Sequence, residues 1–205
     1  MNAVLRRGYR QRRLVSGPAN LAGRLHTVQR DGEPLATYTY DANSNRTGTT
    51  YAGAWAAVLT ACATDAPITA DIDAQDRLLR YGTCEYAYNA NGDLEAKLDT
   101  ATNEATSYRY DEFGNLLQVA LPNGDTLDYV IDGLNRRIGK KRNGTVEQTW
   151  LYSGQLEPVA EFDGDGTLIA RYAYAEKSHV PTLMVKGNKT YKIVSDHLGS
   201  VRQVI

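Results

Sequence analysis

The 205-residue sequence has few cysteines, phenylalanines and tryptophans, two of each, and no long apolar run. A transmembrane helix needs about 18 or more consecutive apolar residues, so the sequence predicts none. Lys and Arg number 23 against 24 Asp and Glu, and a net charge of −1 gives no bulk attraction to nucleic acid or anionic membranes. Metal-binding cysteine pairs, glycine-rich phosphate loops and paired-histidine helices are also missing. The sequence therefore predicts neither a cofactor nor a metal site.

Tyrosine and glycine, in contrast, are abundant, with 14 and 18 residues. A tyrosine ring with its hydroxyl suits half-buried positions on a β-sheet. Glycine suits the tight turns that join short strands. The composition therefore predicts an all-β chain of many short strands. An alanine-rich stretch at residues 53–62 is the exception, and it predicts one short helix.

One short phrase recurs along the chain: a tyrosine, then Asp or Asn, then a small turn residue, then an apolar residue. The turn positions are 41, 73, 89, 111, 132 and 163, so the intervals between them are 32, 16, 22, 21 and 31 residues. The period is irregular and centres on about twenty, as in repeat architectures. The repeat residues are Tyr38, Tyr40, Asp41, Asp73, Tyr86, Tyr88, Asn89, Gly92, Tyr108, Tyr110, Asp111, Gly114, Tyr129, Asp132 and Asp163.

Each copy of the phrase predicts a β-hairpin. Tyr-x-Tyr places both rings on one face of a strand, because strand side chains alternate with a period of two. Asp or Asn opens a turn by bonding the backbone two residues on. Gly, Asn or Ser three residues later accepts a positive φ. A single hairpin is not stable alone, so we expect neighbouring hairpins to stack or wrap into one continuous antiparallel sheet.

The end of the chain carries a second motif, with Asp196, His197, Leu198, Gly199, Ser200 and Arg202. Together with the tyrosine–aspartate repeats, it resembles the Rhs/YD-repeat family and its repeat-associated core region, from about Gly23 to the C-terminus. The resemblance implies a curved or spiralling sheet that forms part of a hollow Rhs-type β-shell. It also implies a non-enzymatic role, in which the shell encapsulates or presents a C-terminal polymorphic toxin.

The resemblance suggests three regions: a basic, poorly ordered segment at 1–22, a YD-repeat sheet at 23–149, and a core-like segment at 150–205 that stops after the tail motif. The implied partners are the rest of the shell and its toxin, both absent from this sequence. Self-association through unpaired sheet edges is a further expectation. The parent protein is expected to be secreted or on the cell surface of a bacterium, although this chain shows no signal peptide.

Two other functions were weighed against the shell. Ser195, Asp196 and His197 are adjacent in sequence, so their side chains cannot converge as a catalytic triad must, and we expect no catalytic residue. A structural role for Asp196 and His197 at a turn is favoured instead. The alternative function is a cell-surface adhesive module that binds carbohydrate or protein through its tyrosine-rich β-surfaces. Cys62 and Cys84 are equally compatible with a disulfide and with two free thiols.

Overall fold

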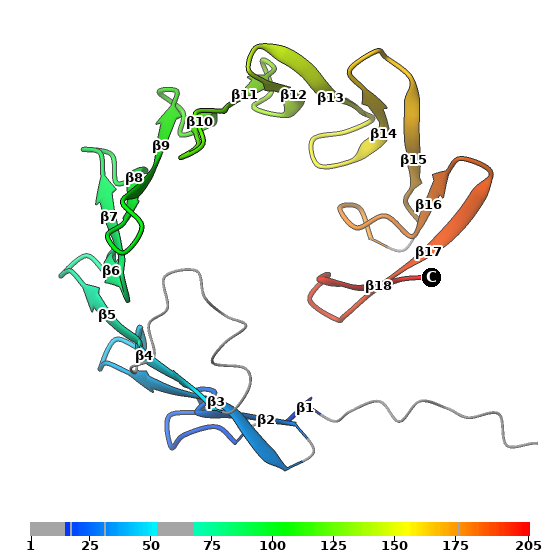
Figure 1. Cartoon of the computed structure of the whole chain (residues 1–205). Helices are drawn as coiled ribbons and strands as arrows, with labels where there is room; N and C mark the ends of the chain where they lie inside the picture. The colour runs from blue at the N-terminus through cyan, green and yellow to red at the C-terminus, as the bar shows by residue number, and fades with distance from the viewer. Residues whose placement is uncertain (1–14, 17, 31, 53–67, 176) are drawn as a thin grey trace, which may run out of the picture. The chain divides into compact units, whose positions relative to one another are not determined.

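The computed structural model of the chain describes residues 15–16, 18–30, 32–52, 68–175 and 177–205 (Figure 1). The predicted helix at 53–62 and most of the basic N-terminal segment lie outside these residues. The chain divides into two compact units. The first ends at Ala87 and includes Leu98–Asn103, and the second comprises Tyr88–Lys97 and Glu104–Ile205.

The strands of the first unit follow one another along the chain. They are β1 (Val15–Ser16), β2 (Thr27–Arg30), β3 (Glu33–Tyr40), β4 (Arg46–Tyr51), β5 (Ile68–Ile72), β6 (Leu78–Tyr81) and β7 (Cys84–Tyr88). Each pairs antiparallel with its neighbour in sequence. Strand β8 (Leu94–Asp99) contains residues of both units.

The second unit repeats this arrangement. Its strands are β9 (Glu104–Tyr110), β10 (Leu116–Ala120), β11 (Thr126–Ile131), β12 (Arg137–Arg142), β13 (Thr145–Tyr152), β14 (Pro158–Asp163), β15 (Leu168–Ala173), β16 (Leu183–Lys186), β17 (Lys189–Ser195) and β18 (Val201–Val204). Every neighbouring pair from β9 to β18 is antiparallel.

The predicted fold class is confirmed: the described residues form antiparallel β-hairpins, and none of them lies in a helix. The described part of the chain accordingly has no helix that could span a membrane. Secondary turns predicted at 122–125, 143–145 and 186–189 are also present, each joining two paired strands.

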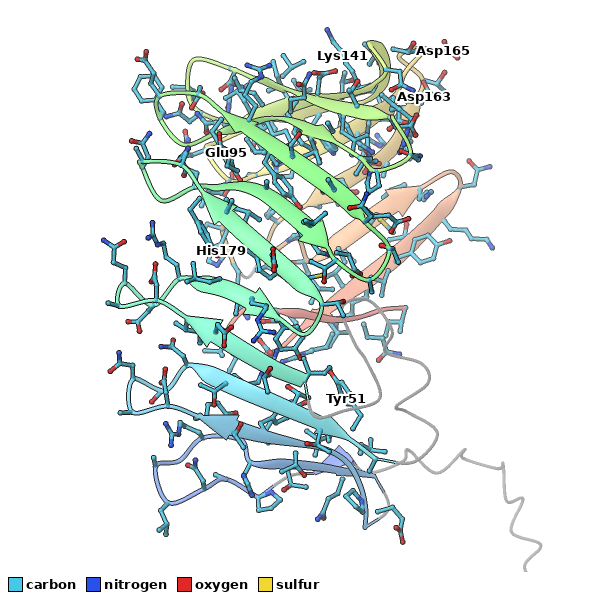
Figure 2. The ribbon with its side chains drawn as sticks, turned by 60° about the vertical axis from the view of Figure 1, so that its left-hand side comes forward. Tyr51, Glu95, Lys141, Asp163, Asp165 and His179 are labelled. Atoms are coloured by element: carbon cyan, nitrogen blue, oxygen red, sulfur yellow. The ribbon has the colours of Figure 1, made fainter. Side chains whose placement is uncertain are left out.

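Side chains stand off alternate sides of each strand (Figure 2). In β9 the half-buried residues Thr106, Tyr108 and Tyr110 alternate with exposed ones. Few apolar side chains among the described residues are fully buried, and most of these are small. They are Ala36, Ile68, Cys84, Val119, Ala160, Ala170 and Val180. Each unit therefore gains its order from strand pairing and half-buried rings more than from a deep core.

The same irregularity in strand pairing recurs at the repeat turns. Tyr110, just before Asp111, pairs with Leu116, and Ile131, just before Asp132, pairs with Arg137. A register shift follows each of these pairs, as at a β-bulge. In both hairpins the residue before the aspartate thus pairs with the residue five positions after it. The same pairing occurs at 40/46, 72/78, 152/158, 162/168 and 195/201.

Candidate functional site

The repeat turn is a five-residue segment that begins at Asp or Asn, and we call it the YD turn. In residues 111–115, Asp111 Oδ1 accepts the backbone N–H of Phe113 at 2.9 Å and of Asn115 at 2.8 Å. The backbone N–H of Asp111 donates to the carbonyl of Asn115, and that of Gly114 donates to the carbonyl of Asp111. Gly114 has a φ of 80°, which lets the chain reverse without a Cβ clash.

The other YD turns use the same bonds. A side-chain oxygen of the first residue accepts N–H groups two and four positions on at Asn20, Asp73, Asn89, Asp132, Asp163 and Asp196. At Asp41 the bond to Asn45 is present. The fourth residue has a positive φ in each, whether it is Gly, Ser, Asp or Asn. Residues 121–125 and 153–157 keep the backbone bond from the first to the fifth residue without an Asp or Asn at the first position.

The fifth residue of the turn is a partner that sequence reasoning missed. Asp111 Oδ2 accepts Asn115 Nδ2 at 2.8 Å, and Asp132 Oδ2 accepts Arg136 Nε at 2.8 Å. In residues 89–93 the roles are exchanged, because Asn89 Nδ2 donates to Asp93 Oδ2 at 3.1 Å. The available signal was the polar residue that stands four positions after each of these turn residues.

These bonds act on the charge of the turn aspartates. The hydrogen bond from Asn115 is the main cause that holds the pKa of Asp111 below its usual value. The hydrogen bond from Arg136 does the same for the pKa of Asp132. Both carboxylates therefore stay ionised at neutral pH, as hydrogen-bond acceptors that close the hairpin.

The repeat tyrosines lie on β3, β7, β9 and β11 and are half-buried. Several tyrosine rings carry an arginine on one face. The Arg46 guanidinium lies 5.2 Å from the centroid of Tyr38, and that of Arg137 lies 4.0 Å from Tyr129. Cation–π stacking of this kind orders the long arginine side chains along the sheet.

The tail motif folds as another YD turn. Asp196 Oδ1 accepts the N–H groups of Leu198 and Ser200, and Asp196 Oδ2 accepts Arg202 Nε at 2.8 Å. Gly199 has a φ of 94°. Although burial works against it, the bonds from Arg202 and the two N–H groups lower the pKa of Asp196. His197 and Leu198 point outward and are exposed.

Residues 195–197 do not form a catalytic triad. Ser195 Oγ accepts a hydrogen bond from Lys177 Nζ at 3.2 Å, and the Asp196 carboxylate is bound by the turn and Arg202. Asp163 and Asp165 lie close together at a turn (Figure 2). However, no group of three potential metal ligands occurs among the described residues.

Cys84 on β7 is fully buried and disulfide-bonded. The other cysteine in the sequence, Cys62, lies outside the described residues. The pairing of Cys62 with Cys84 therefore stays a prediction.

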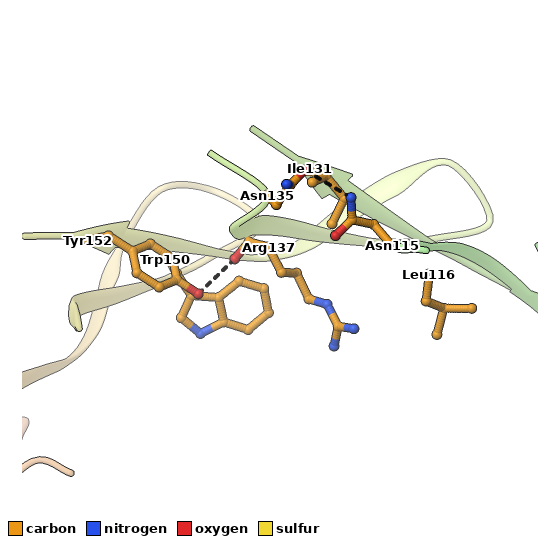
Figure 3. Close-up of a pocket in the computed structure, with 7 residues that line it drawn as sticks. All are labelled: Asn115, Leu116, Ile131, Asn135, Arg137, Trp150 and Tyr152. Atoms are coloured by element: carbon orange, nitrogen blue, oxygen red, sulfur yellow. Dashed lines mark hydrogen bonds between the residues drawn. The ribbon is translucent and has the colours of Figure 1, made fainter. Parts of the chain in front are cut away.

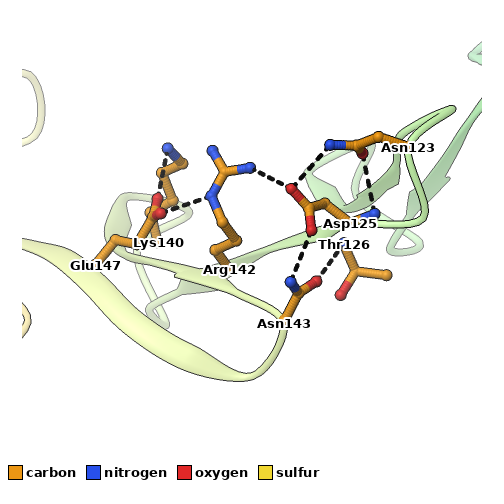
Figure 4. A network of polar contacts seen from close by, with 7 residues as sticks. All are labelled: Asn123, Asp125, Thr126, Lys140, Arg142, Asn143 and Glu147. Carbon is orange, nitrogen blue, oxygen red and sulfur yellow. Dashed lines mark hydrogen bonds and ion pairs between the residues drawn. The ribbon is translucent and has the colours of Figure 1, made fainter.

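A polar network joins two secondary turns of the second unit (Figure 4). Asp125 accepts hydrogen bonds from Asn143 Nδ2 at 2.8 Å and Arg142 Nη1 at 2.9 Å. Arg142 Nε also donates to Glu147 at 2.7 Å, and Lys140 pairs with Glu147 at 2.9 Å. The hydrogen bond from Asn143 is the main cause of a lowered pKa of Asp125. Every charge in this network is paired, so it stabilises the hairpins and leaves no free group for a ligand.

A cavity of about 390 Å³ lies on one face of the sheet from β10 to β13, lined by seven residues (Figure 3). They are Asn115, Leu116, Ile131, Asn135, Arg137, Trp150 and Tyr152. The Trp150 indole and the Arg137 guanidinium point to the same side of the strands. Sequence reasoning missed this pocket, because only the register of four strands brings its residues together.

A second cavity of about 520 Å³ lies next along the sheet and is lined by Glu157, Tyr172, Tyr174 and Lys177, among others. Its polar groups are already engaged. Tyr172 donates to Glu161 at 2.7 Å and Tyr174 donates to the carbonyl of Pro158 at 2.9 Å. Burial, followed by Glu161, raises the pKa of Tyr172 well above its usual value, so this hydroxyl stays protonated.

No curated protein matches the sequence. Solved structures that resemble it are a crystal structure of TcdB2-TccC3 (TM-score 0.42, 13% identity), a crystal structure of TcdB2-TccC3-Cdc42 (0.40, 13%) and a Photorhabdus luminescens Tc holotoxin pore (0.40, 12%). Each match covers 92% of this chain, and the chain spans only 13–14% of the length of those chains.

The teneurin YD-shell family model matches residues 19–205. The match includes the repeat turns from Asn20 to Asp163 and the Asp196 turn of the tail. The family resemblance read from the repeats is thereby confirmed. This chain belongs to the teneurin YD-shell family.

Proposed function

We propose that this chain is a non-enzymatic stretch of wall in a larger YD-shell, and that the shell encapsulates or presents a C-terminal effector. The observation that carries the proposal is the recurrence of one turn, which closes hairpin after hairpin of the sheet. Each hairpin presents half-buried tyrosines, and in the described part of each unit no second layer covers them. A wall that borders an enclosed protein would have such a surface.

The tail supports an extension of the wall to the end of the chain. The Asp196 turn has the bonds and the pairing of the repeat turns, with Ser195 opposite Val201. We therefore propose that 150–205 continues the sheet of 23–149. The non-enzymatic role is supported by the engagement of the candidate catalytic groups Ser195 and Asp196 in structural bonds.

The proposed partners follow from the sheet. Among the described strands, β18 pairs with β17 only, so its other edge offers unpaired backbone groups. We propose that this edge joins the next part of the shell, or another copy of the chain. The disulfide-bonded Cys84 supports a location outside the reducing cytosol, in a secreted or cell-surface protein.

Protease protection tests the shell role on the full-length chain that contains this segment, with an epitope tag in the C-terminal effector region. The epitope should survive digestion behind an intact wall. It should be lost in a variant with Asp111→Ala and Gly114→Val, which breaks one YD turn. A Glu112→Ala variant, changed at an exposed position of the same turn, is the matched control. Equal cleavage of the epitope in all three proteins would contradict encapsulation.

A second candidate function is carbohydrate recognition by an adhesive module. The observation that favours it is the open cavity beside Trp150 and Tyr152, since aromatic faces stack on the apolar faces of sugar rings. Binding of oligosaccharides to the 205-residue chain, measured by isothermal titration calorimetry, tests this function directly. Lack of heat with both neutral and acidic sugars would contradict it.

A further inference from the structure

We infer that the cavity lined by Arg137 and Trp150 is a binding site for an acidic sugar, with Arg137 on the carboxylate and Trp150 under the ring. The inference rests on the second proposed function, carbohydrate recognition, and not on the shell role. The cavity volume of about 390 Å³ falls in the range of small-molecule sites, which is about 300–1,000 Å³.

The charge of the site comes from Arg137. No acidic residue lines the cavity, and within the described part of the chain the Arg137 guanidinium makes no ion pair or hydrogen bond. Its plane is held by stacking on Tyr129, 4.0 Å from the ring centroid. Stacking leaves the N–H groups at the edge of the guanidinium open, in the fork that matches a carboxylate. The neighbouring Arg136, in contrast, is paired with Asp132 at 2.7 Å.

The remaining lining groups suit a ring with hydroxyls. The Trp150 indole lies beside the Arg137 guanidinium and offers a flat apolar surface (Figure 3). Asn115 Nδ2 donates to Asn135 Oδ1 at 3.1 Å, which fixes both amides. Asn115 Oδ1 and Asn135 Nδ2 have no hydrogen-bond partner among the described residues. The pair therefore offers one acceptor and one donor, as sugar hydroxyls require.

The strands around the cavity argue against a peptide. Peptides that bind sheets usually add a strand to an exposed edge. Strands β10, β11, β12 and β13 are each paired on both sides, so their backbone groups are already engaged. Recognition at this face has to come from side chains alone, and this favours a small ligand with a carboxylate and several hydroxyls.

The test is calorimetry on the 205-residue chain with trigalacturonic acid and with its methyl-esterified form, which has nearly the same shape without the charge. We expect the acid to bind about tenfold or more tightly than the ester, because an Arg–carboxylate pair is a strong charge-assisted contact. Arg137→Gln should remove this preference. Lys141→Gln is the matched control, because Lys141 pairs with Asp128 and so lies on the face opposite Tyr129.

The outcomes separate the assignments. Equal binding of acid and ester would keep carbohydrate recognition and overturn the acidic specificity. Equal or tighter binding of N-acetyl-triglutamate would overturn the sugar in favour of an acidic peptide. Absence of binding would overturn the site and the second function, and it would leave the protease-protection result for the shell unaffected. Should Arg137→Gln unfold by circular dichroism, the salt dependence of the wild-type preference decides: no weakening in added NaCl would overturn the role of Arg137.

Discussion

The exchanged roles in residues 89–93 allow a sharp test of the YD turn. Replacing Asn89 by Asp keeps the oxygen that accepts the N–H groups of Asn91 and Asp93, both at 2.9 Å. It also replaces the amide that donates to Asp93 Oδ2 at 3.1 Å by a second carboxylate oxygen. One charge-assisted hydrogen bond is lost, and two like charges then face each other across the turn.

The loss is worked out from these two effects. A hydrogen bond to a charged group contributes about 1.5–3 kcal/mol, and like charges at this distance repel by about 1 kcal/mol or more near a solvated surface. We expect Asn89→Asp to lower the free energy of unfolding by about 3 kcal/mol and the melting temperature by about 6–12 °C for a chain of this size. Adding Asp93→Asn restores the arrangement found at Asp111 and Asn115, and with it most of the stability.

Urea denaturation at neutral pH measures wild type, the two single variants and the double variant as a cycle. The deficit of Asn89→Asp should also shrink in acid, because two facing carboxylates share a proton more readily than one carboxylate takes it up alone. A single variant as stable as wild type, or a double variant no better than Asn89→Asp, would refute the role assigned to the fifth residue of the turn.

Three further predictions concern the same hairpins. Gly164→Ala should lower the melting temperature by several degrees, because its Cβ would meet the backbone carbonyl of the preceding hairpin, whereas Gly133→Ala at the equivalent position has open space and should not; equal melting curves would contradict this. The pKa of Asp132 is lower in the folded protein than in the unfolded chain, so its contribution is fully present above about pH 4 and is lost as the pH falls further. The urea midpoint should therefore drop in acid less for Asp132→Asn than for wild type, and parallel curves would argue against the linkage. Intact mass before and after reduction should differ by two protons if Cys62 and Cys84 are bonded, and unchanged mass would exclude the pair.

The turns could be predicted because their contacts are local. The bond from Asp111 to the N–H two residues on, and the positive φ of Gly114, depend on five consecutive residues. The turn proposed at Gly199 was reached in the same way. The equivalence of the tail turn to the repeats was not, because Arg202 reaches Asp196 Oδ2 from six positions away, whereas Asn115 and Arg136 do so from four.

The pocket could not be predicted, because it depends on strand register. Leu116, Ile131 and Trp150 are about fifteen to twenty residues apart, and a shift of one residue would turn each to the other face. The bulge before each turn sets that register. Sequence spacing alone gives neither the bulge nor the strand partner. The unpaired state of Arg137 follows only from the complete set of contacts around it.

The pairing of each strand with its neighbour in sequence has a consequence for how the protein forms. Within each unit the hairpins are closed by residues a few positions apart, so little loop entropy is lost before each new strand is held. Folding can advance from one hairpin to the next as the chain emerges from a ribosome or an export channel. The free edge of the last strand formed is then the template for the next, and growth in one direction gives the sheet its order without any contact between distant parts of the sequence.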